Sequence, residues 1–342
     1  MPNYRFTQLD VFTETPFAGN SLAVFPEAEG LTDDQMMKIA REMNLSETVF
    51  VFRPTDNRLP ATAEDQQTAN SQEPGGQSNQ QSAVSNPQSP LRRLRIFTPA
   101  REIPFAGHPI VGTWNLLARE GVVPLPEGGT GFTRIMHEVG IGILPVDIEF
   151  KDGTPVQVVM TQGKFEIKGE VDDATDQAEL ARALGLTTED FDESLPIQIV
   201  STGLAFMAVP IRTREALGRC RVNSSLLAEI YQRFNGTGCE TFTRDVMEPA
   251  SRAHVRMFAP GDNIAEDPAT GSAAGALGAY LVHHGAANVA AVHGISRFVI
   301  EQGDFMHRPS RINLEVKGTP GAISEVRVGG PSVVVATGEV FF

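Results

Sequence analysis

The segment EDPATGSAAGALGAYLV, from Glu266 to Val282, sets an acidic residue, a proline and small polar residues before a run that is almost entirely apolar. A run that is apolar on every side is typical of a buried helix. Its start has two interpretations. Asp267 is either an ordinary N-terminal cap followed by Pro268, or part of a first helical turn that faces a ligand.

A second segment has the same layout: GHPIVGTWNLLAREG, from Gly107 to Gly121, places His108 before a mostly apolar helix. Other landmarks recur in the same order in both halves of the chain, namely GNSLAVFP with GLAFMAVP, SETVFVF with CETFTRD (Glu47 with Glu240), and RIFTP with RMFAP. The sequence offset between a landmark in the first half and its match in the second half drops sharply once, after Glu47. An insertion in the first half would cause such a drop. The shared order indicates a duplication, and two unrelated α+β domains are the alternative.

The insertion is visible at residues 55–90, which are rich in Gln, Ser, Asn and Pro and poor in large apolar residues. This composition predicts a mobile surface loop. We therefore divide the chain into an N-terminal lobe, 1–148, which carries this loop, and a C-terminal lobe, 149–342. In each lobe strand signals surround one buried helix, expected at 110–121 and 272–285, which predicts an α+β fold with a sheet curled around a helix. A further helix is expected at 31–44, where Thr32 and Gln35 have capping-box spacing.

Composition excludes several classes of protein. The net charge is −14 and the longest basic run is RRLR at 92–95, so a sequence-independent nucleic-acid partner is not expected. Cys220 and Cys239 have no metal-ligand spacing, and neither a metal site nor a disulfide framework is predicted. No stretch is apolar for membrane length and no secretion signal begins the chain, which predicts a cytoplasmic protein without a membrane partner.

Three ionisable residues stand out by their setting: Glu47 at a helix-to-strand junction, and His108 and Asp267 ahead of the two buried helices. If the duplicated loops face each other, these side chains meet in a cleft. Gly271 and Ser272 would then offer helix N-terminal N–H groups to a small anion. A buried Glu47 would have a raised pKa and could move protons near neutral pH. The simpler interpretations are that Asp267 is a helix cap, that His108 is a hydrogen-bonded loop histidine and that Glu47 is a solvated residue at the junction.

At these residues the sequence resembles the PhzF-like family, the phenazine-biosynthesis isomerase group of the diaminopimelate epimerase-like fold. The matching segments are DVFTETPFAGNSLAVF, MNLSETVFVF, RIFTPAREIPFAGHPIVGTW, AEDPATGSAAGALGAYL and EQGDFMHRPSRI. The resemblance implies two lobes, each a mixed β-barrel around a central helix, in a fold that allows terminal strands to be exchanged between lobes. It also implies a homodimer and a reaction without cofactor.

The resemblance assigns roles by motif: NLSET makes Glu47 the proton carrier, and FAGHP and EDPATGS make His108 and Asp267 its catalytic partners. Substrate binding is implied for four further residues, Asn20, Gly107, Gly271 and Ser272. The thiol-dependent epimerases of this fold carry cysteines where this chain has Ala106 and Thr270, which disfavours two-thiol racemisation.

The leading hypothesis is a cofactor-independent isomerase that moves a proton on a small carboxylate-bearing metabolite through Glu47. A non-catalytic protein-interaction role, as in the MAWD-binding-protein-like members, is the alternative. Epimerisation of an amino acid is a third option.

Overall fold

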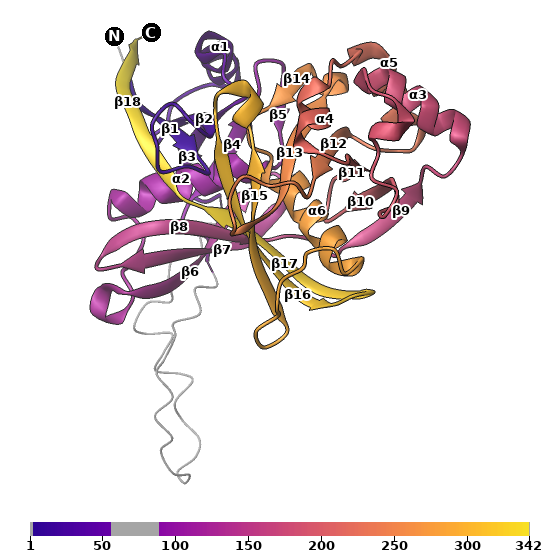
Figure 1. Cartoon of the computed structure of the whole chain (residues 1–342). Coiled ribbons are helices and arrows are strands. Elements are labelled where there is room, and N and C mark those ends of the chain that lie inside the picture. The colour runs from indigo at the N-terminus through magenta and orange to yellow at the C-terminus, as the bar shows by residue number, and fades with distance from the viewer. Residues whose placement is uncertain (1–2, 56–88, 342) are drawn as a thin grey trace, which may run out of the picture.

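Strands from both halves of the chain join in one mixed sheet of the computed structural model, which describes residues 3–55 and 89–341. The predicted insertion at 55–90 falls outside the described residues except at 55, 89 and 90. The strands form two groups that repeat one pairing scheme. Figure 1 shows the first group on the left, and much of the second on the right.

The first group is ordered β18–β1–β2–β3–β4–β6–β7–β8, with β2–β3 and β4–β6 parallel and the other neighbours antiparallel. Short β5 pairs with β4 as a branch. The bounds are β1 (Asn3–Val11), β2 (Asn20–Phe25), β3 (Glu47–Phe52), β4 (Arg93–Phe97), β5 (Glu102–Ile103), β6 (Gly131–Val139), β7 (Gly142–Lys151), β8 (Thr154–Thr161) and β18 (Ser332–Phe341).

The second group is ordered β9–β10–β11–β12–β13–β15–β16–β17, with β11–β12 and β13–β15 parallel and β14 as a branch on β13. Antiparallel pairing of β8 with β17 joins the groups. The bounds are β9 (Glu166–Glu170), β10 (Gln198–Ser201), β11 (Ala205–Pro210), β12 (Gly238–Thr243), β13 (Ser251–Ala259), β14 (Ile264–Asp267), β15 (Ile295–Gln302), β16 (Ser310–Thr319) and β17 (Ala322–Gly330).

Each group ends on a strand that follows the other group's joining strand in sequence, and only in the first group does that strand come from the far end of the chain. β18, at the C-terminal end, pairs with β1, and β9, which follows β8, pairs with β10. The two chain ends consequently lie together in Figure 1. The division into lobes at 148 and 149 stays a prediction, and these two residues lie inside β7.

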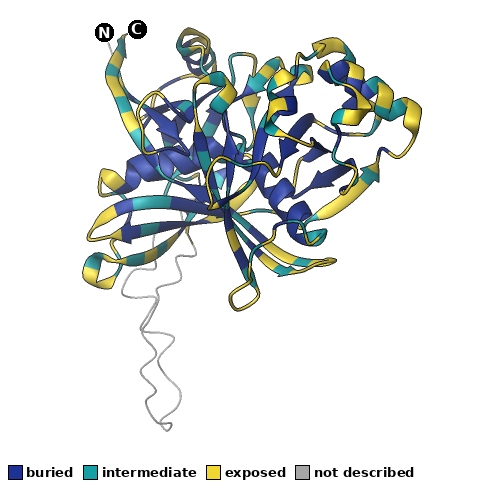
Figure 2. Cartoon of the chain, viewed as in Figure 1, coloured by how far each residue is buried: buried dark blue, intermediate teal, exposed yellow. Residues whose placement is uncertain are grey.

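One buried helix lies inside each group: α2 (Gly107–Arg119) contacts β1, β2, β3, β7, β8 and β18, and α6 (Gly271–His283) contacts β10, β11, β15, β16 and β17. Both are dark in Figure 2, whereas outer helices show an exposed side. The outer helices are α1 (Asp33–Met43), α3 (Ala174–Leu184), α4 (Arg214–Arg219) and α5 (Ser224–Arg233). The predicted mixture of sheet and buried helices is confirmed, and the finer division into two barrels stays a prediction.

Helix starts differ from expectation at two places. α1 has the predicted capping box of Thr32 and Gln35. However, α2 begins at Gly107, before the predicted residue 110, and α6 begins at Gly271 with Thr270 as its N-cap residue. The sequence reading that Asp267 and Pro268 start this helix is therefore wrong. Asp267 ends β14 and pairs with Met257 of β13, so sheet pairing holds its backbone.

The strand register shows that Glu47 and Glu240, which the sequence landmarks pair, do not occupy equivalent positions. In the first group Leu22 of β2 lies beside Glu47, and in the second group the matching residue of β11, Phe206, lies beside Gly238. Gly238 therefore occupies the place of Glu47, and Glu240 lies two residues further along β12. Because side chains alternate with period two, Glu240 keeps the same face of the strand but lies deeper in the group.

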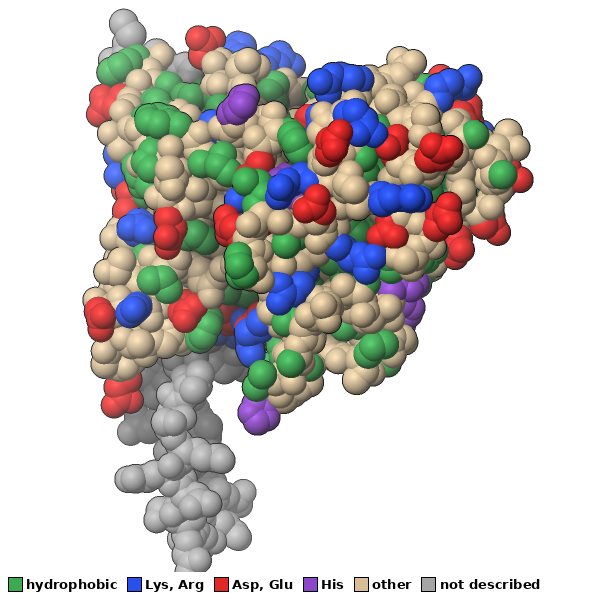
Figure 3. All heavy atoms as spheres, viewed as in Figure 1, with side chains coloured by type: hydrophobic (Ala, Val, Ile, Leu, Met, Phe, Trp, Pro, Cys, Tyr) green, Lys and Arg blue, Asp and Glu red, His purple; other side chains and the backbone are tan. Residues whose placement is uncertain are grey.

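The surface in Figure 3 carries acidic and basic side chains intermixed over much of the visible face. Among the described residues, no helix is both long enough and apolar enough to cross a membrane.

Candidate functional site

The N-termini of the two buried helices meet at the junction of the strand groups. A Cβ atom added to Gly107 would lie 3.7 Å from the backbone nitrogen of Ser272. The N-cap residue is Ala106 in α2 and Thr270 in α6. Neither side chain makes a capping hydrogen bond to its helix. Helix N-termini leave their first N–H groups unpaired and carry partial positive charge. Two such ends that face each other can hold an anion.

Glu47 lies beside this junction, at the first position of β3. Its Oε2 atom is 3.4 Å from Nε2 of His108, and neither atom has a hydrogen-bond partner although both are buried. Burial raises the pKa of the Glu47 carboxyl to about 7, and the hydroxyl of Ser46 opposes this shift. The carboxyl is therefore divided between its neutral and charged forms near neutral pH, which suits a group that accepts and returns a proton.

His108 is the second residue of α2, and its ring is buried. Burial lowers the pKa of His108 to about 4, and the Asp267 carboxylate opposes this shift. The ring is thus neutral at physiological pH. Its Nδ1 atom lies 3.4 Å from the Asn20 amide nitrogen, and its Nε2 atom faces Glu47.

Asp267 is tied to residues from distant parts of the chain. The Asn20 amide donates to Oδ1 of Asp267 at 2.9 Å and to the carbonyl of Ala269 at 2.9 Å, while the hydroxyl of Thr270 donates to the other carboxylate oxygen of Asp267. Burial raises the pKa of Asp267 to about 6, and neighbouring His108 opposes the shift. Both amide hydrogens of Asn20 are therefore donated to acceptors within the protein. We call Asn20, Glu47, His108 and Asp267 the acid–base cluster.

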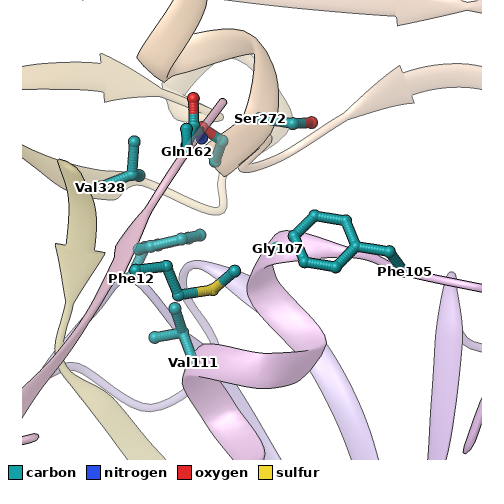
Figure 4. A pocket seen from close by; sticks show the side chains of 9 residues that line it. Phe12, Phe105, Gly107, Val111, Gln162, Ser272 and Val328 are labelled. Carbon is teal, nitrogen blue, oxygen red and sulfur yellow. Dashed lines mark hydrogen bonds between the residues drawn. The ribbon is translucent and has the colours of Figure 1, made fainter. Parts of the chain in front are cut away.

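A small cavity of about 10 Å³ lies between the two helix starts. Figure 4 shows the two helices approaching it, with the Phe12 and Phe105 rings on opposite sides. Three of the predicted binding residues, Gly107, Gly271 and Ser272, line it. The full lining is Phe12, Phe105, Gly107, Val111, Met160, Gln162, Gly271, Ser272 and Val328. We call this the site cavity.

The predicted residues thus fall into two adjoining sets. Gly107, Gly271 and Ser272 line the site cavity, whereas Asn20 and the three ionisable residues form the acid–base cluster. Gly107 and His108 are neighbours in the first turn of α2, which connects the sets.

The sequence did not single out several residues that build the site. Gln162 lines the cavity, donates to the Gly271 carbonyl at 2.9 Å and accepts from the Thr202 hydroxyl. Gln302 donates to the Asp267 carbonyl at 2.7 Å and to the Thr270 hydroxyl at 3.1 Å. Phe12 and Gln302 do lie within the segments DVFTETPF and EQGDF that carry the family resemblance. Gln162 has no such signal, because a lone amide after a strand is common.

The cysteines are distant from the predicted chemistry. Cys220 and Cys239 are free and buried in the apolar cluster beneath α3 and α5. Over the described ranges, no group of three or more His, Cys, Asp or Glu side chains is placed to hold a metal ion.

The fold resembles that of a solved epimerase. The hydroxyproline epimerase of Agrobacterium vitis shares it with a TM-score of 0.56 and 12% identity, over 99% of this chain and 92% of that chain. A phenazine biosynthesis protein of the PhzF family from Bacillus anthracis superposes with a TM-score of 0.79 and 24% identity, over 100% of both chains.

The chain belongs to the family of phenazine biosynthesis-like proteins, whose model matches residues 9–64 and 81–338. An uncharacterized isomerase of Clostridium acetobutylicum is 34% identical over 98% of both chains. The trans-2,3-dihydro-3-hydroxyanthranilate isomerase of Pseudomonas aeruginosa is 30% identical over 99% of both.

Proposed function

We propose that this chain is a cofactor-independent isomerase that moves a proton on a small carboxylate-bearing metabolite, with Glu47 as the proton carrier. The observation that carries the proposal is the buried Glu47 carboxyl, whose pKa is about 7 and whose Oε2 atom has no hydrogen-bond partner. A carboxyl of this kind is poised to exchange protons at neutral pH.

The proposed reaction balances without a further reactant. The Glu47 carboxylate takes a proton from a carbon of the substrate, and the electron pair of that C–H bond spreads over the neighbouring conjugated system. The protonated Glu47 then gives the proton to a different carbon of that system. Glu47 returns to its starting state and the product is an isomer of the substrate.

The helix starts would hold the substrate carboxylate. Gly107, Gly271 and Ser272 line the site cavity from the first turns of the two helices, where the partial charges of both helices favour an anion. They would also stabilise negative charge that spreads onto the carboxylate during proton transfer. In this proposal neutral His108 orients or shares the proton of Glu47, and Asp267 lies next to that ring, with Asn20 in contact with both residues.

Relatives supply the first substrate to test. Three relatives are named as trans-2,3-dihydro-3-hydroxyanthranilate isomerases. Incubation of this compound in D₂O with the wild-type protein should place deuterium in it or in its product, as mass spectrometry would detect. Glu47→Gln should bind the compound without labelling it. Labelling that persists in Glu47→Gln would remove Glu47 from the role of proton carrier.

The proposal extends to assembly. We propose a homodimer, which the family resemblance supports, and light scattering after size exclusion would measure the mass. The alternative of a non-catalytic interaction role gains no support from the relatives, since several are named as isomerases.

A further inference from the structure

A much larger surface groove shares a lining residue with the site cavity. This outer groove has a volume of about 570 Å³, against about 10 Å³ for the site cavity. Of the described residues, Phe12 alone lines both spaces. The remaining lining of the outer groove is Thr13, Glu14, Thr15, Ala18, Glu149, Val156, Gln157, Glu248, Pro309, Arg311, Asn313 and Pro331.

We infer that Phe12 sets the size limit of the ligand: the carboxylate binds between the helix starts, and the distal part of a larger ligand enters the outer groove only past this ring. The inference rests on the proposed function, because it takes the site cavity as the place of the carboxylate. A cavity of about 10 Å³ accommodates roughly one water molecule, so any carboxylate metabolite must displace part of the wall.

The Phe12 ring closes against two glycines. A Cβ atom on Gly271, the first residue of α6, would lie 3.0 Å from Cζ of Phe12, and one on Gly330 would lie 2.7 Å from Cδ1. Side chains at either position would thus collide with the ring. The ring lies against the helix turn that we propose offers N–H groups to the carboxylate. A ligand that extends from this turn toward the groove meets Phe12 first.

The backbone holds Phe12 in an unfavourable conformation. Its φ angle is 63°, in the left-handed region that bulky residues avoid. Two hydrogen bonds fix it there: Phe12 N–H donates to the Pro331 carbonyl at 2.9 Å, and the Arg311 N–H donates to the Phe12 carbonyl at 2.8 Å. Strain of this kind persists where the surroundings enforce it, and it clusters at ligand-binding positions. Here the strained conformation aims an aromatic ring inward, where it is fully buried.

The charge of the outer groove guides the choice of probes. Glu14, Glu149 and Glu248 line it, and the only basic lining residue, Arg311, already pairs with Glu248 and Asp304. A second anionic group on the ligand would be repelled there. Probes should therefore carry one carboxylate and an uncharged distal part.

The experiment compares benzoate with biphenyl-4-carboxylate, which differ only in the distal ring. Their dissociation constants are measured by calorimetry for the wild type, Phe12→Ala and Phe105→Ala. Phe105 lines the site cavity but not the outer groove, so its removal is the matched control. Phe12→Ala should improve the affinity for biphenyl-4-carboxylate relative to benzoate at least tenfold over the wild type. Phe105→Ala should leave that ratio within about twofold.

Two other outcomes would contradict either the role of Phe12 or the proposed carboxylate site. An unchanged ratio in Phe12→Ala, or an equal rise in Phe105→Ala, would overturn the role of Phe12. Failure of the wild type to bind either carboxylate would instead overturn the proposed carboxylate site, and with it this inference. If Phe12→Ala does not fold, Phe12→Gly serves in its place, because glycine adopts the left-handed conformation without strain.

Discussion

Glu47 and Glu240 begin as matched residues of two sequence repeats, yet the fold gives them different surroundings. Glu47 is the first residue of β3 and lies beside His108 and the helix starts. Glu240 lies two residues deeper along β12, fully buried, and neither of its carboxylate oxygens has a hydrogen-bond partner. Burial raises the pKa of Glu240 to about 8. The comparison teaches that a raised pKa does not by itself define a site: of these two glutamates, Glu47 is the one that lies beside His108, at the helix starts that we propose as the ligand site.

The largest expected effect is a difference in catalytic activity between variants of these two glutamates. Glu47→Gln should reduce kcat/KM by about 10³-fold or more, since it removes the proposed general acid–base group. Glu240→Gln should leave kcat/KM within a few fold, because Glu240 lines neither the site cavity nor the outer groove. Steady-state kinetics with the substrate identified by deuterium labelling makes the comparison. Equal losses in the two variants would abolish the distinction drawn between them.

A smaller effect is expected where the helix starts face each other. Gly107→Ala should fold normally, since its Cβ would lie at an ordinary 3.7 Å from Ser272. The added methyl group would occupy the gap between the N–H groups and weaken benzoate binding by about 10- to 100-fold, the loss of one or two charge-assisted hydrogen bonds.

Gly169→Ala is the control for that variant, because its Cβ would also meet its nearest neighbour, Ile199, at 3.7 Å but lies outside the site cavity. Calorimetric titration should show unchanged benzoate affinity for Gly169→Ala. Wild-type affinity in Gly107→Ala would show that the carboxylate does not bind between the helix starts.

A last effect concerns stability rather than the site. In the folded state Glu240 stays protonated up to about pH 8, whereas in the unfolded chain it ionises near pH 4.5. The folded state therefore binds more protons between these values, and this residue lowers stability as pH rises through that window, by at most about 1.4 kcal/mol per pH unit. Urea unfolding from pH 5 to pH 8 should show a smaller loss of stability in Glu240→Gln than in the wild type. Identical pH dependence in the two proteins would show that Glu240 is not held neutral.

Much of this arrangement could be read from the sequence because it depends on local pattern. The capping box at Thr32 and Gln35 needs only residues three apart, and the all-apolar run after Gly271 needs only composition. Motif resemblance predicted that Glu47, His108 and Asp267 share one site. In the structure Glu47 faces His108, and Asn20 contacts both His108 and Asp267.

The remainder depends on contacts that no local pattern encodes. Asp267 before Pro268 looks like a helix cap, but its carboxylate is bound by Asn20, a residue from the opposite end of the chain. The Glu240 match fails because a two-residue change of strand register preserves the face of the sheet and alters only depth. Phe12 and Gln162 carry no ionisable group, so only the packing of the helix starts reveals that they line the cavity.

The most direct test of the central claim is the pH dependence of kcat/KM in the wild type. If Glu47 must be ionised to take the proton, kcat/KM should rise about tenfold per pH unit below pH 7 and level off above it, following the pKa of about 7 that burial gives this carboxyl. Asp267→Asn should retain that break, because we propose Glu47 and not Asp267 as the proton carrier. A wild-type profile that is flat between pH 5 and pH 9, or that breaks near the ordinary glutamate value, would contradict proton transfer by a buried Glu47.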